Sequence, residues 1–263
     1  NVAREVPVNV ALSNSFGFGG NNAVLAFTTP GDRESGTGAP SVRALRVVAY
    51  SCLTGAGGTE ATLKRFFEGL PCQGVLPADR LTEGMPPRSV RRMKRLARIA
   101  LGLAVRTMAR ADVKDQVGDV YFGTALGALS ETHSFLNKLY ASNEFYTSPI
   151  DFVGSVHNAP AGKVAMKENI QGANVTMSGG DASFEQALTA ARYLTTESQQ
   201  PFLVGGADEM HPIFSEVFDS SVTMGDMPSD GGGMLLLKPA ADGPSLVLSP
   251  GYLAVTGDVT AAL

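Results

Sequence analysis

The chain has little cysteine, little charge and no long hydrophobic run, and each shortage excludes a class of protein. Among its 263 residues are two cysteines, Cys52 and Cys72, which form neither a disulfide framework nor a zinc-ligand spacing, so a cytoplasmic location is expected. Charged residues make up 17% of the chain and the net charge is −4, which argues against a general nucleic-acid-binding protein. The longest apolar segment, residues 99–105, is too short to span a bilayer.

What remains is the composition of a globular protein, with 44% hydrophobic residues and alternating strand and helix patterns from residue 46 onward. The predicted strands are 46–52, 117–122, 174–177, 201–204, 234–238 and 245–248. The predicted helices are 59–68, 89–111, 130–140, 160–169 and one that begins at or just after 181. Loops are predicted over 70–87 and 223–229. This alternation predicts an α/β fold with a largely parallel sheet and helices on both faces.

The stretch GANVTMSGGDASFEQALTAA, residues 172–191, predicts a strand, a tight turn and a helix. Gly179 and Gly180 have no Cβ and allow the backbone to turn sharply. Asp181, which follows them, is expected on the first helical turn, where free N–H groups and the helix dipole attract negative charge. It is therefore either an N-cap or a carboxylate with a chemical role, because several enzyme families hold a nucleophile on such a turn.

A second distinctive stretch is NSFGFGGNN at residues 14–22, between predicted strands 7–13 and 23–28. This pattern predicts a hairpin, and since a lone hairpin is marginally stable it should pack on something larger. Residues 30–42 are polar and rich in Gly, Pro and Ser, as in a linker.

Together these stretches resemble the β-ketoacyl synthases of the thiolase superfamily. GANVTMSGGDAS resembles the element that carries the family's catalytic cysteine, with Asp181 in the place of that cysteine. NSFGFGGNN resembles the NSFGFGGTN signature near the C-terminal end of these enzymes. The resemblance implies that Phe18 is the residue that gates the active site and whose backbone N–H helps to form the oxyanion hole. Residues 91–108, 155–174, 205–210 and 229–239 resemble further family elements in the same order.

The resemblance implies a thiolase-like layered fold and an unusual order of domains, because a C-terminal signature precedes an N-terminal-type domain. We expect a piece of a longer chain. Residues 1–29 would be the C-terminal hairpin of one ketosynthase-type domain, and 30–44 a linker. Residues 45–254 would be a second, ketosynthase-like N-terminal domain, followed by a tail at 255–263.

The chain departs from the family at its catalytic residues. An aspartate cannot replace a thiolate as acyl acceptor, and neither motif that carries the family's two catalytic histidines occurs here. His133, His157 and His211 are expected to be structural or solvated, and Cys52 has no histidine nearby in the sequence. The resemblance is thus to the cysteine-less, chain-length-factor-like members.

The expected function is that of a catalytically silent subunit or domain that partners an active β-ketoacyl synthase in fatty-acid or polyketide synthesis and shapes its acyl pocket. A homodimer or a heterodimer is expected. The resemblance places the strand at 174–177 on the dimer axis. No metal or cofactor is expected, since the glycines at 55–58 miss the third glycine of a dinucleotide fingerprint. By position, the pocket or partner interface is expected to include Phe16, Phe135, Phe145, Tyr146 and Ser183.

Two further interpretations stay open. The basic residues of the predicted helix 89–111 are either a solvated face or a docking surface for an acidic acyl carrier protein, through Arg91, Arg92 and Arg95. The alternative function is a malonyl-carrier-protein decarboxylase or acyl hydrolase that uses Asp181. Without the two histidines, such an enzyme would lack the groups that stabilise developing charge.

Overall fold

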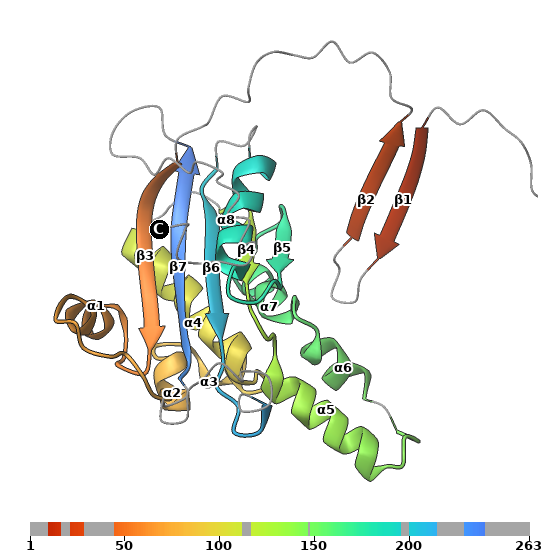
Figure 1. Cartoon of the computed structure of the whole chain (residues 1–263), viewed down its shortest axis with the longest axis horizontal. Coiled ribbons are helices and arrows are strands. Elements are labelled where there is room, and N and C mark those ends of the chain that lie inside the picture. The colour runs from red at the N-terminus through yellow and green to blue at the C-terminus, as the bar shows by residue number, and fades with distance from the viewer. Residues whose placement is uncertain are drawn as a thin grey trace, which may run out of the picture.

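The computed structural model describes residues 10–16, 22–28, 45–111, 117–146, 148–195, 200–214 and 229–239 (Figure 1). Within these ranges the strands form a two-stranded and a five-stranded sheet. Antiparallel strands β1 (Val10–Phe16) and β2 (Asn22–Thr28) make the smaller sheet and confirm the predicted hairpin. Neither strand pairs with the larger sheet. The predicted domain boundaries stay predictions.

The first strand of the hairpin extends three residues further than predicted, to Phe16. Asn14, Ser15 and Phe16, which the sequence placed in the turn, pair with Val24, Ala23 and Asn22. Backbone pairing between the two strands therefore continues past Ser13, and the connection between them is shorter than the Gly/Asn pattern indicated. Phe18 and the linker lie outside the described residues.

The larger sheet has the strand order β3-β7-β6-β4-β5. Its strands are β3 (Leu45–Thr54), β4 (Val120–Gly123), β5 (Asn174–Met177), β6 (Phe202–Asp208) and β7 (Gly231–Pro239). β4 is parallel to β5 and β6, whereas β7 is antiparallel to β6 and to β3. The sheet is therefore mixed, with its parallel strands at the β5 side. The predicted strand 245–248 lies outside the described residues.

Helices cover both faces of this sheet, as predicted. They are α1 (Thr59–Phe67), α2 (Ala78–Leu81), α3 (Pro87–Val90), α4 (Arg95–Ala111), α5 (Leu129–Ala141), α6 (Pro149–Ser155), α7 (Ala159–Glu168) and α8 (Ser183–Leu194). α4 packs on β3, β6 and β7 and α7 on β4 and β5, while α8 packs on β4, β5 and β6. Successive side chains of a strand point to opposite faces, so Val120 and Phe122 join the core on the α4 side and Tyr121 joins the core on the α8 side.

The predicted helix 89–111 is wrong in its first part. α3 ends at Val90, a turn closed by the bond from Met93 N to the Val90 carbonyl follows, and α4 begins only at Arg95. The apolar spacing hides this break because Val90, Met93, Ala97 and Leu101 belong to one buried cluster on both sides of the turn. The helices α2 and α3 also occupy part of the predicted loop 70–87, and α6 was not predicted.

Candidate functional site

The strand–turn–helix at β5 and α8 forms the centre of the candidate site. β5 has the predicted bounds, and Gly180 takes a left-handed backbone conformation with φ of 65°, which a glycine adopts without strain. α8 begins at Ser183, and its N-cap position is Ala182, without a side-chain cap. The interpretation of Asp181 as an N-cap is therefore wrong. Asp181 is exposed at the turn instead.

Ser183 closes this turn and fixes it to the neighbouring strand. Gly179 N donates to its Oγ at 2.9 Å, and the hydroxyl lies 2.6 Å from the Gly180 carbonyl and 3.1 Å from the Thr124 carbonyl. The residue is 4% exposed. The single proton of this hydroxyl is used within the fold, so Ser183 positions the turn and is not free to act as a nucleophile.

Asp181 and Ser183 both line a cleft of about 620 Å³ on the α8 side of the sheet. Other lining residues come from β3, β6, β7 and the end of β4. The polar side chains among its described lining are Tyr50, Ser51, Cys52, Asp181, Ser183, Asp208 and Ser229. The structure thus places Asp181 in an open cleft, and its correspondence to the family's catalytic cysteine stays a prediction.

The described lining of this cleft holds no activated nucleophile. Burial raises the pKa of the Cys52 thiol, although the charge of Arg110 opposes this, so the thiol is less ionised than a free cysteine. No histidine is among the lining residues that the structure describes. Cys52 therefore has neither a low pKa nor an adjacent base to activate it.

The second carboxylate of the cleft, Asp208 at the end of β6, is already engaged. It accepts hydrogen bonds from the Thr124 hydroxyl at 2.8 Å and from the N–H groups of Ala125 and Leu126, each at 3.0 Å. These bonds hold the loop between β4 and α5. Asp208 is thus a positioning residue, and Asp181 is the exposed carboxylate of the described lining.

None of the three histidines is among the described lining of this cleft, although His157 lies next to the turn. His157 Nδ1 is 3.0 Å from the Ser178 hydroxyl, just before the turn. The rings of His133 and His211 meet edge to face, with their centroids 4.7 Å apart. Each of the three rings thus contacts a neighbouring side chain, and their structural or solvated roles stay a prediction.

The aromatic residues predicted for the acyl pocket do not join Asp181. Phe135 of α5 packs on Phe152 of α6, with ring centroids 5.7 Å apart. Phe145 and Tyr146, between these helices, are 94% and 64% exposed. The side chain of Phe16 is not described. The structure therefore divides the predicted site between the cleft and a projecting pair of helices, α5 and α6 (Figure 1).

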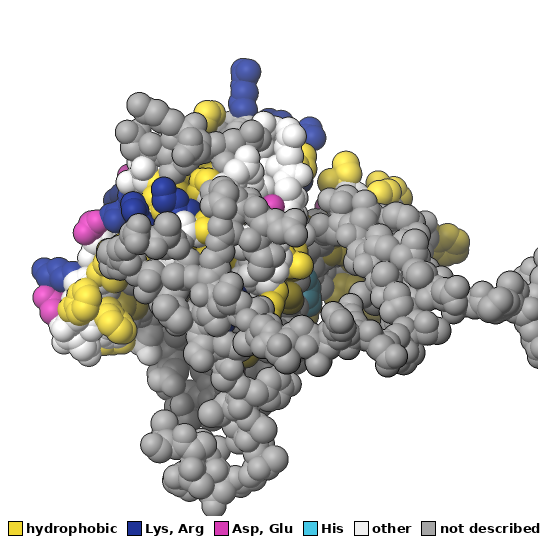
Figure 2. Space-filling view, turned by 90° about the horizontal axis from the view of Figure 1, so that it is seen from above, with side chains coloured by type: hydrophobic (Ala, Val, Ile, Leu, Met, Phe, Trp, Pro, Cys, Tyr) yellow, Lys and Arg dark blue, Asp and Glu magenta, His cyan; other side chains and the backbone are white. Residues whose placement is uncertain are grey.

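Large hydrophobic side chains gather on the surface of this pair, which we call the α5–α6 arm (residues 129–155). Besides Phe145 and Tyr146, the exposed residues on it are Leu136, Tyr140, Ile150 and Phe152. Figure 2 shows hydrophobic side chains at the surface on the side of the arm, and others at the opposite end, on the side of α1. Exposed apolar side chains that gather in this way are more typical of interaction surfaces than of the rest of a protein surface.

The three arginines predicted to dock a carrier protein do not share a face. Arg91 and Arg92 are exposed and line a groove of about 360 Å³ between α3 and α7. Arg88, Lys163 and Lys167 line the same groove. No acidic residue is among its described lining, so this basic groove (Arg88, Arg91, Arg92, Lys163, Lys167) is a strongly positive surface.

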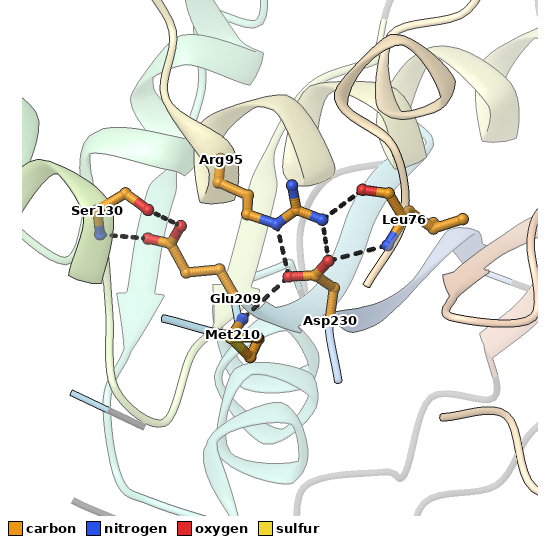
Figure 3. Close-up of polar contacts among 6 residues, drawn as sticks. All are labelled: Leu76, Arg95, Ser130, Glu209, Met210 and Asp230. Carbon is orange, nitrogen blue, oxygen red and sulfur yellow. Dashed lines mark hydrogen bonds and ion pairs between the residues drawn. The ribbon is translucent and has the colours of Figure 1, made fainter. Parts of the chain in front are cut away.

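Arg95 points inward, so its assignment to the outer face is wrong (Figure 3). Its Nε donates to Asp230 Oδ1 at 2.7 Å, and its Nη2 contacts Asp230 Oδ2 and the Leu76 carbonyl. The side chains of Arg95 and Asp230 are 19% and 1% exposed, and Asp230 also accepts from Met210 N at 2.9 Å. The ion pair raises the pKa of Arg95 and locks α4 to the start of β7.

Beside this ion pair, the buried Glu209 accepts from the N–H of Ser130 at 2.8 Å and from its hydroxyl at 2.5 Å (Figure 3). Sequence reasoning missed the roles of Asp208, Glu209 and Asp230. The available signal was their position, since each acid stands close to the end or the start of a predicted apolar strand.

Comparisons with known proteins agree with this architecture. The family model "Beta-ketoacyl synthase, N-terminal domain" matches residues 75–248. The ishigamide ketosynthase/chain length factor has a TM-score of 0.66 at 22% identity, over 77% of this chain and 64% of that one. The ketosynthase ApeO in complex with its chain length factor ApeC from Xenorhabdus doucetiae has a TM-score of 0.60 at 20% identity, over 75% and 80%.

A third structure, AntDE:AntF, contains a type II polyketide synthase acyl-carrier protein in complex with its ketosynthase. It has a TM-score of 0.63 at 13% identity, over 75% of this chain and 63% of that one. No curated protein sequence is significantly similar to this chain. The shared fold is therefore that of ketosynthases and chain length factors, and the chain spans 64% of the length of the first structure named above. No helix within the described ranges is long and apolar enough to cross a membrane.

Proposed function

Because the chain belongs to the β-ketoacyl synthase family through its N-terminal domain, we propose that it is a non-condensing, chain-length-factor-like subunit. It pairs with an active β-ketoacyl synthase and shapes the pocket for that enzyme's acyl chain. The observation that carries this proposal is the cleft beside Asp181. The turn at Asp181, which resembles the one that carries the family's cysteine, opens onto a cleft whose described lining contains no activated thiol and no histidine.

Two features support a partner subunit. β5 is the last strand in the order of the sheet, so one of its edges is free among the described strands and can extend the sheet with a strand of the partner. The projecting α5–α6 arm supplies apolar side chains, of which Phe145 and Ile150 are 94% and 79% exposed. Burial of such side chains is a main source of free energy for association.

The basic groove supports docking of an acyl carrier protein. Its five cations make no ion pair with another described residue, so their charge faces solvent. Acyl carrier proteins are acidic, and a positive groove increases the rate at which such a partner associates. Decarboxylation or hydrolysis by Asp181 is not proposed, because the described cleft supplies no group to stabilise the developing charge.

The test of subunit pairing is association with the cysteine-containing β-ketoacyl synthase from the same organism, measured by native mass spectrometry and sedimentation. We expect a heterodimer with the unaltered chain. The double variant Phe145→Ser and Ile150→Ser should weaken it at least about tenfold, since two buried anchors of an interface carry more than about 1.4 kcal/mol together.

A matched control is Phe66→Ser with Phe67→Ser on α1, where the side chains are 70% and 80% exposed. This pair alters the same kind of surface at the opposite end of the molecule and should leave association unchanged. Equal effects of the two double variants, or no complex with the unaltered chain, would refute the assignment of the arm as the interface.

Carrier docking is tested separately with Arg91→Glu combined with Arg92→Glu. We expect the dissociation constant for acyl carrier protein at low salt to rise at least about tenfold. This is the effect of losing two exposed charge pairs at the edge of an interface, each contributing about 0.7 kcal/mol. Arg46→Glu with Lys64→Glu is the control, because it changes the net charge equally at positions outside the groove. The docking idea fails if both double variants weaken binding to the same extent, since only net charge would then matter.

A further inference from the structure

A second cleft, of about 590 Å³, lies between α4, α5 and the chain just after β6. It is separate from the cleft beside Asp181 and from the basic groove, except that Met93 also borders the groove. Its polar lining consists of cationic, imidazole, hydroxyl and amide groups: Lys94, Arg95, Arg98, Lys138, His133, His211, Ser130, Ser134 and Asn137. Neither Asp nor Glu is among the described residues that line it.

Not all of this positive charge is available to a ligand. Arg95 is neutralised by Asp230, and Lys138 Nζ is 2.6 Å from Asp151 Oδ2. Arg98 uses its Nε to bind the Met93 carbonyl at 2.8 Å, which leaves its two terminal nitrogens without a hydrogen bond to any described residue. The ammonium group of Lys94 likewise forms no ion pair there.

We propose that this cleft binds the phosphate group of a small phosphorylated molecule. The terminal nitrogens of Arg98 form a planar fork that matches two phosphate oxygens, and Lys94 adds a point charge beside it. The hydroxyl of Ser134 is a further donor on the wall. Leu81 and Met93 give the cleft an apolar side, and its volume exceeds that of a phosphate, so the ligand carries an uncharged organic part.

The histidine pair makes this site sensitive to pH. His211 Nδ1 accepts from the N–H groups of Ile213 and Phe214, each at 3.3 Å, and burial together with the charge of His133 lowers the pKa of His211. A bound anion favours the charged form of the His211 imidazole, so binding takes up a proton and strengthens as the pH falls.

Other ionisable groups face the same region from each packed element. They are Lys94 just before α4, Arg95 and Arg98 of α4, Glu131 and Lys138 of α5, Asp151 of α6, Glu209 after β6, and Asp230 before β7. Burial raises the pKa values of Glu131 and Glu209, so these two groups also release protons at a higher pH than an exposed glutamate does. When Glu131 and Glu209 lose their protons, anion binding weakens, as it does when His211 loses its proton.

The experiment is calorimetric titration of the full chain with inorganic phosphate, pyrophosphate and glycerol 3-phosphate at constant ionic strength. We expect saturable binding, tightest for glycerol 3-phosphate because it carries an organic part, and a loss of at least about tenfold in affinity in Lys94→Gln with Arg98→Gln. Lys64→Gln with Arg46→Gln is the matched control and should bind like the unaltered chain.

The pH dependence is measured with sulfate, because this anion does not titrate near neutral pH. Affinity should fall as the pH rises through the range in which histidine titrates, and His211→Asn, whose side-chain oxygen can still accept a hydrogen bond, should flatten the dependence. Absence of saturable binding by all four anions, or equal loss in the charge variant and its control, overturns the proposal. Circular dichroism of each variant excludes misfolding as the cause of lost binding.

Discussion

Glu131 illustrates how a single buried carboxyl group makes a fold depend on pH. Its Oε1 accepts from Lys94 N at 3.1 Å, while Oε2 is buried without a hydrogen-bond partner in the described chain. Burial, reinforced by the nearby charge of Glu209, raises the pKa of Glu131 to about 7. The folded chain therefore keeps a proton on Glu131 that the unfolded chain releases near pH 4.5.

This shift predicts that the free energy of unfolding falls as the pH rises from about 4.5 to about 7, the window between the two pKa values. The stabilisation that protonated Glu131 contributes is fully present below this window and is lost above it. For a shift of this size it amounts to at most about 3 kcal/mol. Glu131→Gln mimics the protonated form, so it should be more stable than the unaltered chain above this window by about 1–3 kcal/mol and equally stable below it. Urea unfolding on both sides of the window measures the difference.

Glu185→Gln on the exposed side of α8 is the control for removing one negative charge. If the free energy of unfolding differed between Glu131→Gln and the unaltered chain by the same amount at every pH, the raised pKa of Glu131 would be contradicted. Such a result would mean that Glu131 is ionised, or equally solvated, in the folded protein.

Among the elements, the contact between β4 and α8 sets the position of the candidate site. A Cβ atom on Gly123 would lie 2.6 Å from the backbone carbonyl of Ser183, and both residues belong to regular elements that cannot give way separately. The helix that follows Asp181 can approach the strand only because residue 123 has no side chain. The same close approach explains how the Ser183 hydroxyl reaches the Thr124 carbonyl.

Gly123→Ala should therefore lower the free energy of unfolding by about 1–3 kcal/mol or more, because an overpacked core must shift backbone. Gly162→Ala on α7 is the matched substitution, since a Cβ there meets no atom within 4 Å. It should stabilise the chain by about 0.5–1 kcal/mol through helix propensity and a less flexible unfolded state. Thermal unfolding of the two variants gives the comparison. Equal changes would show that α8 does not approach β4 this closely in solution.

Local patterns predicted β5 and the turn after it, because two glycines and an apolar strand determine that geometry within a few residues. The same reasoning failed between Ser89 and Arg95, where apolar spacing continues through a turn. It also placed Arg95 on the surface. The partner of Arg95 is Asp230, 135 residues later, and no local pattern shows that pairing. The cleft itself was not predictable, since β3, β6, β7 and α8 contribute to it together.

At the scale of the whole molecule, the family's condensation requires a nucleophile and two histidines, and the resemblance assigns the histidines to another part of a ketosynthase. Asp181→Cys replaces only the first of these. We expect this variant to release no more CO₂ from malonyl-carrier protein than Asp181→Ser, although its exposed thiol should be alkylated by iodoacetamide. Turnover clearly above that of Asp181→Ser would show that the chain holds a complete catalytic centre.

The pairing of β3 with β7 has a consequence for how the protein acquires its fold. Among the described strands, β3 (Leu45–Thr54) pairs only with β7 (Gly231–Pro239), so a growing chain on the ribosome exposes β3 until β7 has been synthesised. Contacts so distant in sequence close slowly, and an unpaired hydrophobic strand invites aggregation in the meantime. Slower translation or chaperone depletion should therefore harm the yield of this chain more than that of a domain built from neighbouring hairpins.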